Sequence, residues 1–168
     1  MKNIINIAVV GLGQVGIYLL NELNTKKKDI ELKTGKKINV VAVSARSISK
    51  KRKFKVNKKI FFKKPLEIFN KTKVDILFEA IGMSDGISKK VVETALKNKI
   101  HVITPNKALI SKHGDYLAKL AEDNNVNLEF EASVAGGIPI LRTIKEGLAT
   151  NKISNSKLTL FSSANFPK

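Results

Sequence analysis

The feature that most constrains the fold is a set of three closely spaced glycines between a strand-like segment and a helix-like segment. The residues Gly11-Leu12-Gly13-Gln14-Val15-Gly16 directly follow the apolar run 4–10 and overlap the start of 14–24, where apolar side chains recur at helical spacing. In such a turn the first glycine permits a tight bend, the second lets backbone approach a pyrophosphate, and the third lets helix pack on strand. The helix also offers free N–H groups and a positive partial charge to phosphates. The spacing predicts a dinucleotide-binding turn; the alternative is a glycine-rich turn without a ligand.

The rest of the chain alternates short apolar runs with segments of helical period. Besides 4–10, we expect strands over 38–44, 74–80, 100–104, 126–131 and 157–161. We expect helices over 14–24, around 66–69, and over 87–96, 112–124 and 138–148. Strands separated by helices in this order indicate βαβ units. The predicted fold class is therefore α/β, with a Rossmann-like, doubly wound and mostly parallel sheet.

Composition excludes several classes of protein. The chain has 168 residues, 43% of them hydrophobic and none of them cysteine, which allows one sizeable core but no disulfide or thiolate metal site. No apolar run approaches the ~18 residues that a membrane-spanning helix needs. The apolar run near the N-terminus leads into glycines instead of a cleavage site, so a signal peptide is not expected. We expect a soluble, cytoplasmic protein without a membrane partner.

The formal net charge of +17 raises the question of a nucleic-acid partner. All but three of the 31 basic residues are lysines, the exceptions being Arg46, Arg52 and Arg142. Specific nucleic-acid readers use arginine for bidentate base contacts, so this bias is more typical of genome-wide composition. The densest lysine cluster lies within 50–64. We interpret it first as a solvated loop, second as a surface near an anionic cofactor, and only third as a nucleic-acid site.

The end of the second predicted strand bears on the choice between NAD and NADP. An acidic residue there would hold the adenosine ribose hydroxyls and repel a 2′-phosphate. The sequence instead reads Val43-Ser44-Ala45-Arg46, in which no carboxylate is present. An arginine pairs with phosphate through two parallel hydrogen bonds. This position favours NADP, with NAD still possible; the alternative is that Arg46 faces water.

Further polar residues follow the third and fourth predicted strands. Gly82 and Ser84 stand where a nicotinamide ribose would pass, at the carboxyl ends of the strands. Ser84 or Asp85 would also serve as a helix N-cap. Thr104 and Lys107 follow the fourth strand on the same side of the sheet. Lys107 is a candidate for steering a carbonyl or carboxylate, and the alternative is one more surface lysine.

Taken together, these segments resemble homoserine dehydrogenase. The resemblance rests on 11–16, 40–46, 81–86, 104–110 and, most specifically, on Phe130-Glu131-Ala132-Ser133-Val134-Ala135-Gly136-Gly137-Ile138-Pro139-Ile140 followed by Glu146-Gly147-Leu148. It covers nearly the whole chain. It implies NAD(P)H-dependent reduction of L-aspartate 4-semialdehyde to L-homoserine, on the route to threonine and methionine. It also implies a homo-oligomer for the full-length family.

The resemblance assigns roles to residues as well. The cofactor-binding set that it implies is Gly11, Gly13, Gln14, Val15, Gly16, Arg46, Gly82, Ser84, Thr104 and Lys107. Ser84, Thr104 and Lys107 would lie near the nicotinamide ribose and the reacting centre, and Lys107 is the one candidate catalytic residue. A sodium ion would be held by the carboxylate of Glu131 and the carbonyls of Val134, Gly136 and Ile138.

The sequence departs from the family pattern in two places. Pro105 stands where the family usually has a small residue, and the family's Asn-Gly-Thr-x-Asn segment appears only as Phe161-Ser162-Ser163-Ala164-Asn165. The family's lysine general acid, substrate-binding acids and dimerising sheet would lie beyond Lys168. We therefore expect an NAD(P)-binding domain over 1–131 and an incomplete, truncated start of the catalytic domain over 132–168. Efficient turnover by this chain alone is not expected, and the alternative is an NADP-binding module without catalysis.

Overall fold

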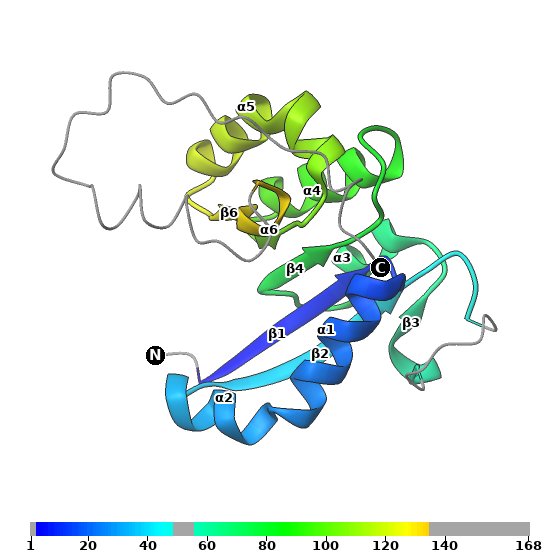
Figure 1. The fold of residues 1–168 in the computed structure, drawn as a ribbon, viewed down its shortest axis with the longest axis vertical. Helices are drawn as coiled ribbons and strands as arrows, with labels where there is room; N and C mark the ends of the chain where they lie inside the picture. Colours follow the sequence, from blue (N-terminus) through cyan, green and yellow to red (C-terminus); the bar gives the residue numbers. More distant parts are fainter. Residues whose placement is uncertain (1–2, 49–55, 135–168) are drawn as a thin grey trace, which may run out of the picture.

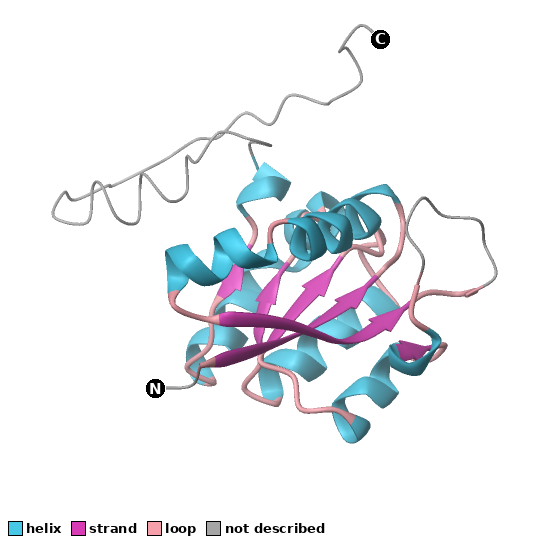
Figure 2. Ribbon diagram, turned by 90° about the horizontal axis from the view of Figure 1, so that it is seen from below, coloured by secondary structure: helices cyan, strands magenta, loops and turns pink. Residues whose placement is uncertain are grey.

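A computed structural model describes residues 3–48 and 56–134 of the chain. Within these residues six strands form one sheet in the order β3-β2-β1-β4-β5-β6, with every neighbouring pair parallel. The strands are β1 (Ile4–Val10), β2 (Lys37–Ser44), β3 (Phe61–Phe62), β4 (Ile76–Glu79), β5 (His101–Ile103) and β6 (Leu128–Glu129). The predicted α/β fold with a doubly wound parallel sheet is confirmed, and Figures 1 and 2 show helices on both faces of the sheet.

In residues 3–48 and 56–134, six α-helices connect or follow the strands. They are α1 (Gln14–Thr25), α2 (Lys27–Thr34), α3 (Ile68–Lys71), α4 (Ile87–Lys97), α5 (Lys107–Asp123) and α6 (Glu131–Val134), with short 3₁₀ helices at Lys58–Ile60 and Pro65–Glu67. No helix within the described residues is both long enough and apolar enough to cross a lipid bilayer. The predicted helix 138–148 and strand 157–161 lie outside the described residues.

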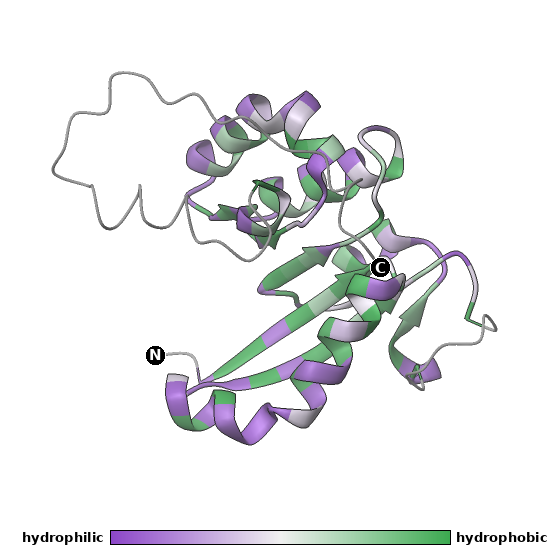
Figure 3. Cartoon of the chain, in the orientation of Figure 1, coloured by the Kyte–Doolittle hydropathy of each residue, from purple (hydrophilic) through white to green (hydrophobic). Residues whose placement is uncertain are grey.

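The first strand supplies both halves of the core, because successive side chains of a strand point to opposite faces. Ala8 and Val10 pack in one cluster with the buried face of α4 and with α5. Ile7 and Val9 pack in a second cluster with Leu20 of α1. Figure 3 shows the resulting pattern, with apolar residues along the strands and hydrophilic ones over α2. The sheet therefore has a buried centre at β1 and β4.

Several element boundaries differ from the sequence-based expectation. Helix α5 begins at Lys107 instead of residue 112, because the Asn106 side chain accepts a hydrogen bond from Leu109 N at 3.2 Å and caps the helix there. The predicted strand 126–131 is shorter, and Glu131 begins α6. Helix α2 and the two-residue strand β3 were not expected. The order of the sheet reverses between β1 and β4, which is the place where parallel α/β sheets bind ligands.

Candidate functional site

The glycine loop joins the carboxyl end of β1 to α1, and its three glycines meet different surroundings. Gly11 has φ +99°, and a Cβ added there would lie 2.3 Å from the carbonyl oxygen of Ala80. A Cβ on Gly16 would lie 2.0 Å from the carbonyl oxygen of Gly11. A Cβ on Gly13 would meet nothing within 4 Å. The first and third glycines are thus required by the packing of the chain itself, whereas the second leaves an open surface.

This open surface coincides with the start of α1. Gly13 is the N-cap residue of the helix, and no side chain caps it by a hydrogen bond. The first N–H groups of any α-helix have no acceptor within the helix. At the same place Gly11 N donates to the carbonyl oxygen of Ser44 at 2.9 Å, which ties the loop to the end of β2. A backbone hydrogen bond thus joins the loop to the end of β2, and the start of α1, which has no side-chain cap, lies at the open side of Gly13.

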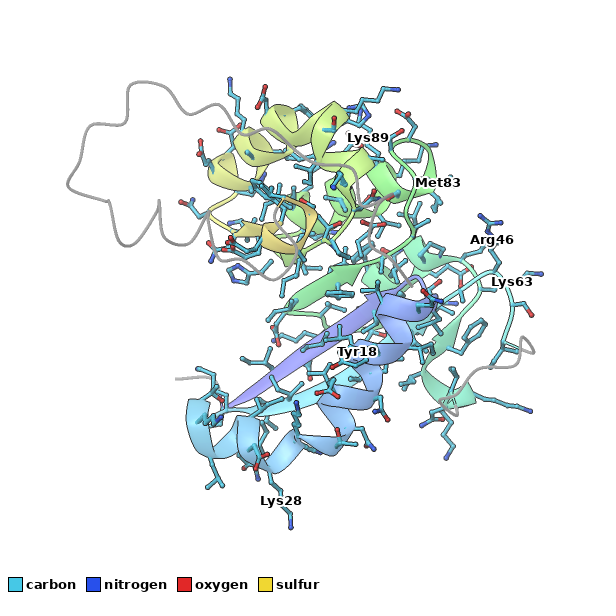
Figure 4. All side chains as sticks on the ribbon, in the orientation of Figure 1. Tyr18, Lys28, Arg46, Lys63, Met83 and Lys89 are labelled. Atoms are coloured by element: carbon cyan, nitrogen blue, oxygen red, sulfur yellow. The ribbon has the colours of Figure 1, made fainter. Side chains whose placement is uncertain are left out.

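A cavity of about 560 Å³ lies beside the loop, over the carboxyl ends of β1, β2 and β4. That size is typical of small-molecule pockets. The lining includes Gly11 and Gly13 from the loop, Arg46 after β2, and Lys63 after β3. The remaining lining residues are Val10, Leu12, Ser44, Ala45, Ser47, Pro65, Ala80, Ile81, Met83 and Ile87. Figure 4 shows Arg46 and Lys63 on the same side of the molecule.

The charges around this cavity are positive. Arg46 and Lys63 are both exposed, and no carboxylate is present among the described residues that line the cavity. The two cations come from segments that follow neighbouring strands, so the parallel pairing of β2 with β3 brings them together. An anionic group at this end of the cavity would meet two positive side chains.

A buried carboxylate lies behind the opposite wall of the cavity. Glu79, the last residue of β4, is 0% exposed. Its Oε1 accepts hydrogen bonds from Ile81 N and from the Ser88 hydroxyl, both at 2.7 Å. Its Oε2 accepts one from the Thr104 hydroxyl at 2.6 Å. Asn106 completes the cluster, because its Nδ2 donates to the Ser88 hydroxyl at 3.0 Å and to the Met83 carbonyl oxygen at 2.9 Å. The network joins β4, α4 and the start of α5.

The loop before α4 is tied to α5 by a surface cluster around Asp85. The Asp85 carboxylate contacts Lys112 Nζ at 2.7 Å, accepts a hydrogen bond from the Ser84 hydroxyl at 2.7 Å, and lies 2.9 Å from His113 Nε2. The pKa of Asp85 is held well below its usual value. The largest cause is the hydrogen bond from Lys112, followed by the hydrogen bonds from Ser84 and His113. Ser84 is thus bound to a neighbouring carboxylate.

The other sequence-predicted residues take different positions. Gly82 is exposed with φ +88°. Thr104 is only 1% exposed, and its hydroxyl is committed to Glu79. Lys107 is exposed at the first position of α5. Gln14 and Val15 are exposed in the first turn of α1. The structure therefore brings Gly11, Gly13 and Arg46 together around the cavity, with Thr104 behind the wall of that cavity.

The predicted sodium ligands lie partly outside the described residues. Glu131 and Val134 are the first and last residues of α6, while Gly136 and Ile138 lie beyond residue 134. Within the described part of the chain, no group of three or more His, Cys, Asp or Glu side chains is placed to hold a metal ion.

Sequence reasoning did not single out Lys63, Glu79 or Asn106 as parts of the site. Lys63 entered only as a member of the cluster within 50–64, for which a surface near an anionic cofactor was the second interpretation. Lys63 carries no signal of its own, since it is one lysine in a cluster and reaches the cavity only through the pairing of β3. Glu79 does carry a signal, because an acidic residue that ends an apolar strand must find hydrogen-bond donors if it is buried. Asn106 directly precedes a helix, which is the typical place of a capping residue.

Comparisons with known proteins show which proteins this chain is similar to. Residues 11–131 match a protein family described as "Homoserine dehydrogenase, NAD binding domain". The homoserine dehydrogenase of Neisseria gonorrhoeae is 36% identical over 162 residues, which are 96% of this chain and 37% of that protein. The Bacillus subtilis homoserine dehydrogenase is 32% identical with the same coverage of 96% and 37%. The chain thus spans about 37% of the length of these relatives.

Solved structures give the same result. A homoserine dehydrogenase from Thiobacillus denitrificans superposes with a TM-score of 0.79 at 31% identity, covering 90% of this chain and 35% of that one. A Staphylococcus aureus homoserine dehydrogenase superposes with a TM-score of 0.74 at 38% identity, covering 82% of this chain and 34% of the other.

Proposed function

This chain belongs to the homoserine dehydrogenase family, and we propose that its glycine loop and the adjoining cavity bind a nicotinamide dinucleotide, with NADP preferred over NAD. The observation that carries the proposal is the cavity at the reversal of strand order. It combines a glycine with open space above it, a helix start without a side-chain cap, and two cations. These features fit a dinucleotide, because the pyrophosphate needs close backbone approach and free N–H groups.

The preference for NADP rests on the far end of the cavity. In folds of this kind the adenosine ribose lies beyond the carboxyl end of the second strand. Arg46 and Lys63 line that end, and no carboxylate lies among the described lining residues to bind the ribose hydroxyls or repel a phosphate. A 2′-phosphate would therefore gain charge-assisted hydrogen bonds there.

For the complete protein we propose the reduction of L-aspartate 4-semialdehyde to L-homoserine, a step in threonine and methionine biosynthesis, in the cytoplasm. When bound, the reduced nicotinamide would supply a hydride to the aldehyde carbon and become the oxidised nicotinamide, while a proton delivered to the aldehyde oxygen would complete the hydroxyl group. Within this chain, the exposed Lys107 at the start of α5 is the residue we assign to orienting the carbonyl or carboxylate of the substrate. Its ammonium group is a donor and a positive charge at the carboxyl edge of the sheet.

A sodium site over Glu131, Val134, Gly136 and Ile138 is a separate proposal that rests on the family resemblance. Glu131 is half-buried at the start of α6, which suits an oxygen ligand of a hard cation. No step proposed for the other residues depends on it.

Titration of the purified chain with NADPH and NADH, followed by nicotinamide fluorescence, tests the cofactor proposal. We expect tighter binding of NADPH. The substitution Arg46→Ala should raise the Kd for NADPH about 10–100-fold, since a hydrogen bond to a charged group contributes about 1.5–3 kcal/mol. The Kd for NADH should change by less than about threefold, because NADH has no 2′-phosphate. Lys63→Ala should act in the same direction.

The matched control is Lys28→Ala, which removes the same charge from α2, far from Arg46 (Figure 4). Equal losses of NADPH affinity in Lys28→Ala and Arg46→Ala would contradict the assignment of a local phosphate contact. Failure of the unaltered chain to bind either nucleotide would contradict dinucleotide binding itself. Oxidation of bound NADPH upon addition of the semialdehyde would extend the proposal from binding to turnover.

A further inference from the structure

Glu79 is not among the residues that line the cavity, yet its carboxylate is fully buried at the end of β4. Of the residues predicted to bind the cofactor, Thr104 contacts it, through a hydroxyl that donates at 2.6 Å. Burial of a carboxyl group in a core is costly unless hydrogen bonds satisfy it, and apolar side chains often fill such positions at no loss of stability. Glu79 is satisfied by Ile81 N, Ser88 and Thr104 at 2.6–2.7 Å. A group held this tightly from three elements fixes the relative position of those elements.

The direction of the hydrogen bonds makes Glu79 the acceptor at the end of the network. Asn106 Nδ2 has two hydrogens, and its shortest contacts are the Met83 carbonyl oxygen at 2.9 Å and the Ser88 hydroxyl at 3.0 Å. Asn106 N donates to the Thr104 hydroxyl at 3.1 Å. Both hydroxyls therefore accept from Asn106 and give their single hydrogen to Glu79. Without an acceptor at Glu79, neither hydroxyl keeps this orientation.

The network also fixes one wall of the cavity. Ile81 and Met83 both line it, on the β4 side. Ile81 is held through its N–H by Glu79, and Met83 is held through its carbonyl oxygen by Asn106. Arg46 and Lys63 lie at the β2 and β3 end, so a dinucleotide with its pyrophosphate over Gly13 directs its nicotinamide half toward Ile81 and Met83.

We propose that Glu79 is a positioning residue for the nicotinamide half of the bound dinucleotide. It orders Ile81 directly, through Ile81 N. It orders Met83 through Asn106, whose Nδ2 lies 3.4 Å from both Glu79 oxygens and is also linked to them through the Ser88 and Thr104 hydroxyls. It does not contact the cofactor itself. The inference rests on the dinucleotide binding proposed above. It adds that the two halves of the dinucleotide depend on different residues: the adenosine half on Arg46 and Lys63, and the nicotinamide half on the wall that Glu79 orders.

The substitution Glu79→Gln tests this division, because it keeps the shape of the side chain and replaces one acceptor oxygen with a donor. Affinities are measured for NADPH and for 2′-phospho-ADP-ribose, which lacks only the nicotinamide ring. We expect the Kd for NADPH to rise about tenfold and that for 2′-phospho-ADP-ribose to stay within about twofold, as for the loss of one ordered contact. The fluorescence of bound NADPH should also shift toward that of the free nucleotide. Glu122→Gln, the same change at an exposed site on α5, should leave both affinities unaltered.

Two results would overturn the inference: equal weakening of both ligands, which indicates a general support of the fold, or no change for either. Absence of binding by the unaltered chain would instead refute the proposed function, and the inference with it. If Glu79→Gln does not unfold cooperatively, Ser88→Ala replaces it, since it leaves the carboxylate in place and removes one link to Asn106. Ser88→Ala should raise the Kd for NADPH about threefold and leave the Kd for 2′-phospho-ADP-ribose unchanged. Equal changes in the two Kd values would overturn the inference as well.

Discussion

At the scale of single residues, the three glycines around the start of α1 differ in why glycine is required: two for the packing of the chain and one for access of a ligand. Gly11 and Gly16 cannot carry a side chain without a shift of the backbone, because an added Cβ would lie 2.3 Å and 2.0 Å, respectively, from a backbone oxygen. Gly13 meets no such limit. Three residues that look equivalent in the sequence therefore have different physical reasons for being glycine.

This difference predicts opposite effects for the same substitution at Gly16 and at Gly13. Gly16→Ala should lower the free energy of unfolding by at least about 1–3 kcal/mol, because the methyl group overlaps the Gly11 carbonyl. Gly13→Ala should change stability by no more than about 0.5–1 kcal/mol. It should nevertheless weaken NADPH binding at least about tenfold, since a methyl group would stand where the pyrophosphate approaches the backbone. Urea denaturation and NADPH titration of both variants measure the two effects.

The opposite result, a stable Gly13→Ala variant with unaltered NADPH affinity, would show that the open surface above Gly13 is not where the pyrophosphate lies. The two variants serve as each other's control, because the chemical change is the same and the positions are three residues apart, Gly13 at the N-cap of α1 and Gly16 in its first turn.

At the scale of elements, the sequence predicts well what local patterns determine. The apolar runs predicted β1 and β2, and the spacing of Val91, Val92, Ala95 and Leu96 predicted α4. These residues are buried, and buried positions recur in the sequence with the period of the element that carries them. Helix α2 was missed because its face is not apolar: none of its residues is buried. Strand β3 was missed because its two residues are a strand only through pairing with Val43 and Ser44.

The same reasoning applies to the candidate site. Gly11, Gly13 and Arg46 were predictable, since the loop spacing and the end of the second strand carry the signal within a few residues. The place of Lys63 within its cluster and the Glu79 network were not predictable. Their positions depend on strand order and on contacts such as the one from Thr104 to Glu79, which are 25 residues apart. The residues at the cavity are therefore easier to predict from the sequence than the buried hydrogen bonds that hold its wall in place.

A second prediction concerns the link between the loop before α4 and α5. The pKa of Asp85 is lowered in the folded chain, first by the hydrogen bond from Lys112 and then by those from Ser84 and His113. A lowered folded pKa means that this contribution to stability is fully present above the ordinary pKa of 3.8 and is lost as the pH falls below it. Asp85→Asn should therefore unfold at lower urea concentration than the unaltered chain at about pH 6, and the difference should shrink toward about pH 2.

Because Asp85 is exposed, salt should reduce the difference at about pH 6 through screening. Asp115→Asn, the same change at an exposed position of α5, is the matched control. A difference between Asp85→Asn and the unaltered chain that is independent of pH would show that the cluster does not contribute through the charge of Asp85.

At the scale of the whole molecule, ligand binding and folding are coupled because the site is built from segments far apart in the chain. The residues that line the cavity come from four separate segments: 10–13, 44–47, residues 63 and 65, and residues 80, 81, 83 and 87. All of these must be in place before a dinucleotide can bind. A ligand that binds only the folded state stabilises it by an amount set by its concentration relative to Kd.

The third prediction follows from this coupling. NADPH at 100 times its Kd should add about 2.7 kcal/mol to the free energy of unfolding. For a domain of this size, that corresponds to an increase in Tm of roughly 5–10 °C. Thermal unfolding followed by circular dichroism, with and without NADPH, measures it. Gly13→Ala at the same NADPH concentration should show a much smaller increase, and an undiminished increase would point to binding elsewhere.

The central place of β1 in the sheet has a consequence for how the chain is made. Of the six strands in the described residues, β1 leaves the ribosome before the others, yet it pairs on one side with β2 and on the other with β4, which ends at Glu79. At about 5–20 residues per second, β4 is completed roughly 2–7 s after β2. For those seconds the nascent chain carries an apolar strand with one edge unpaired, and this is the interval in which a chaperone at the ribosome exit would protect it most.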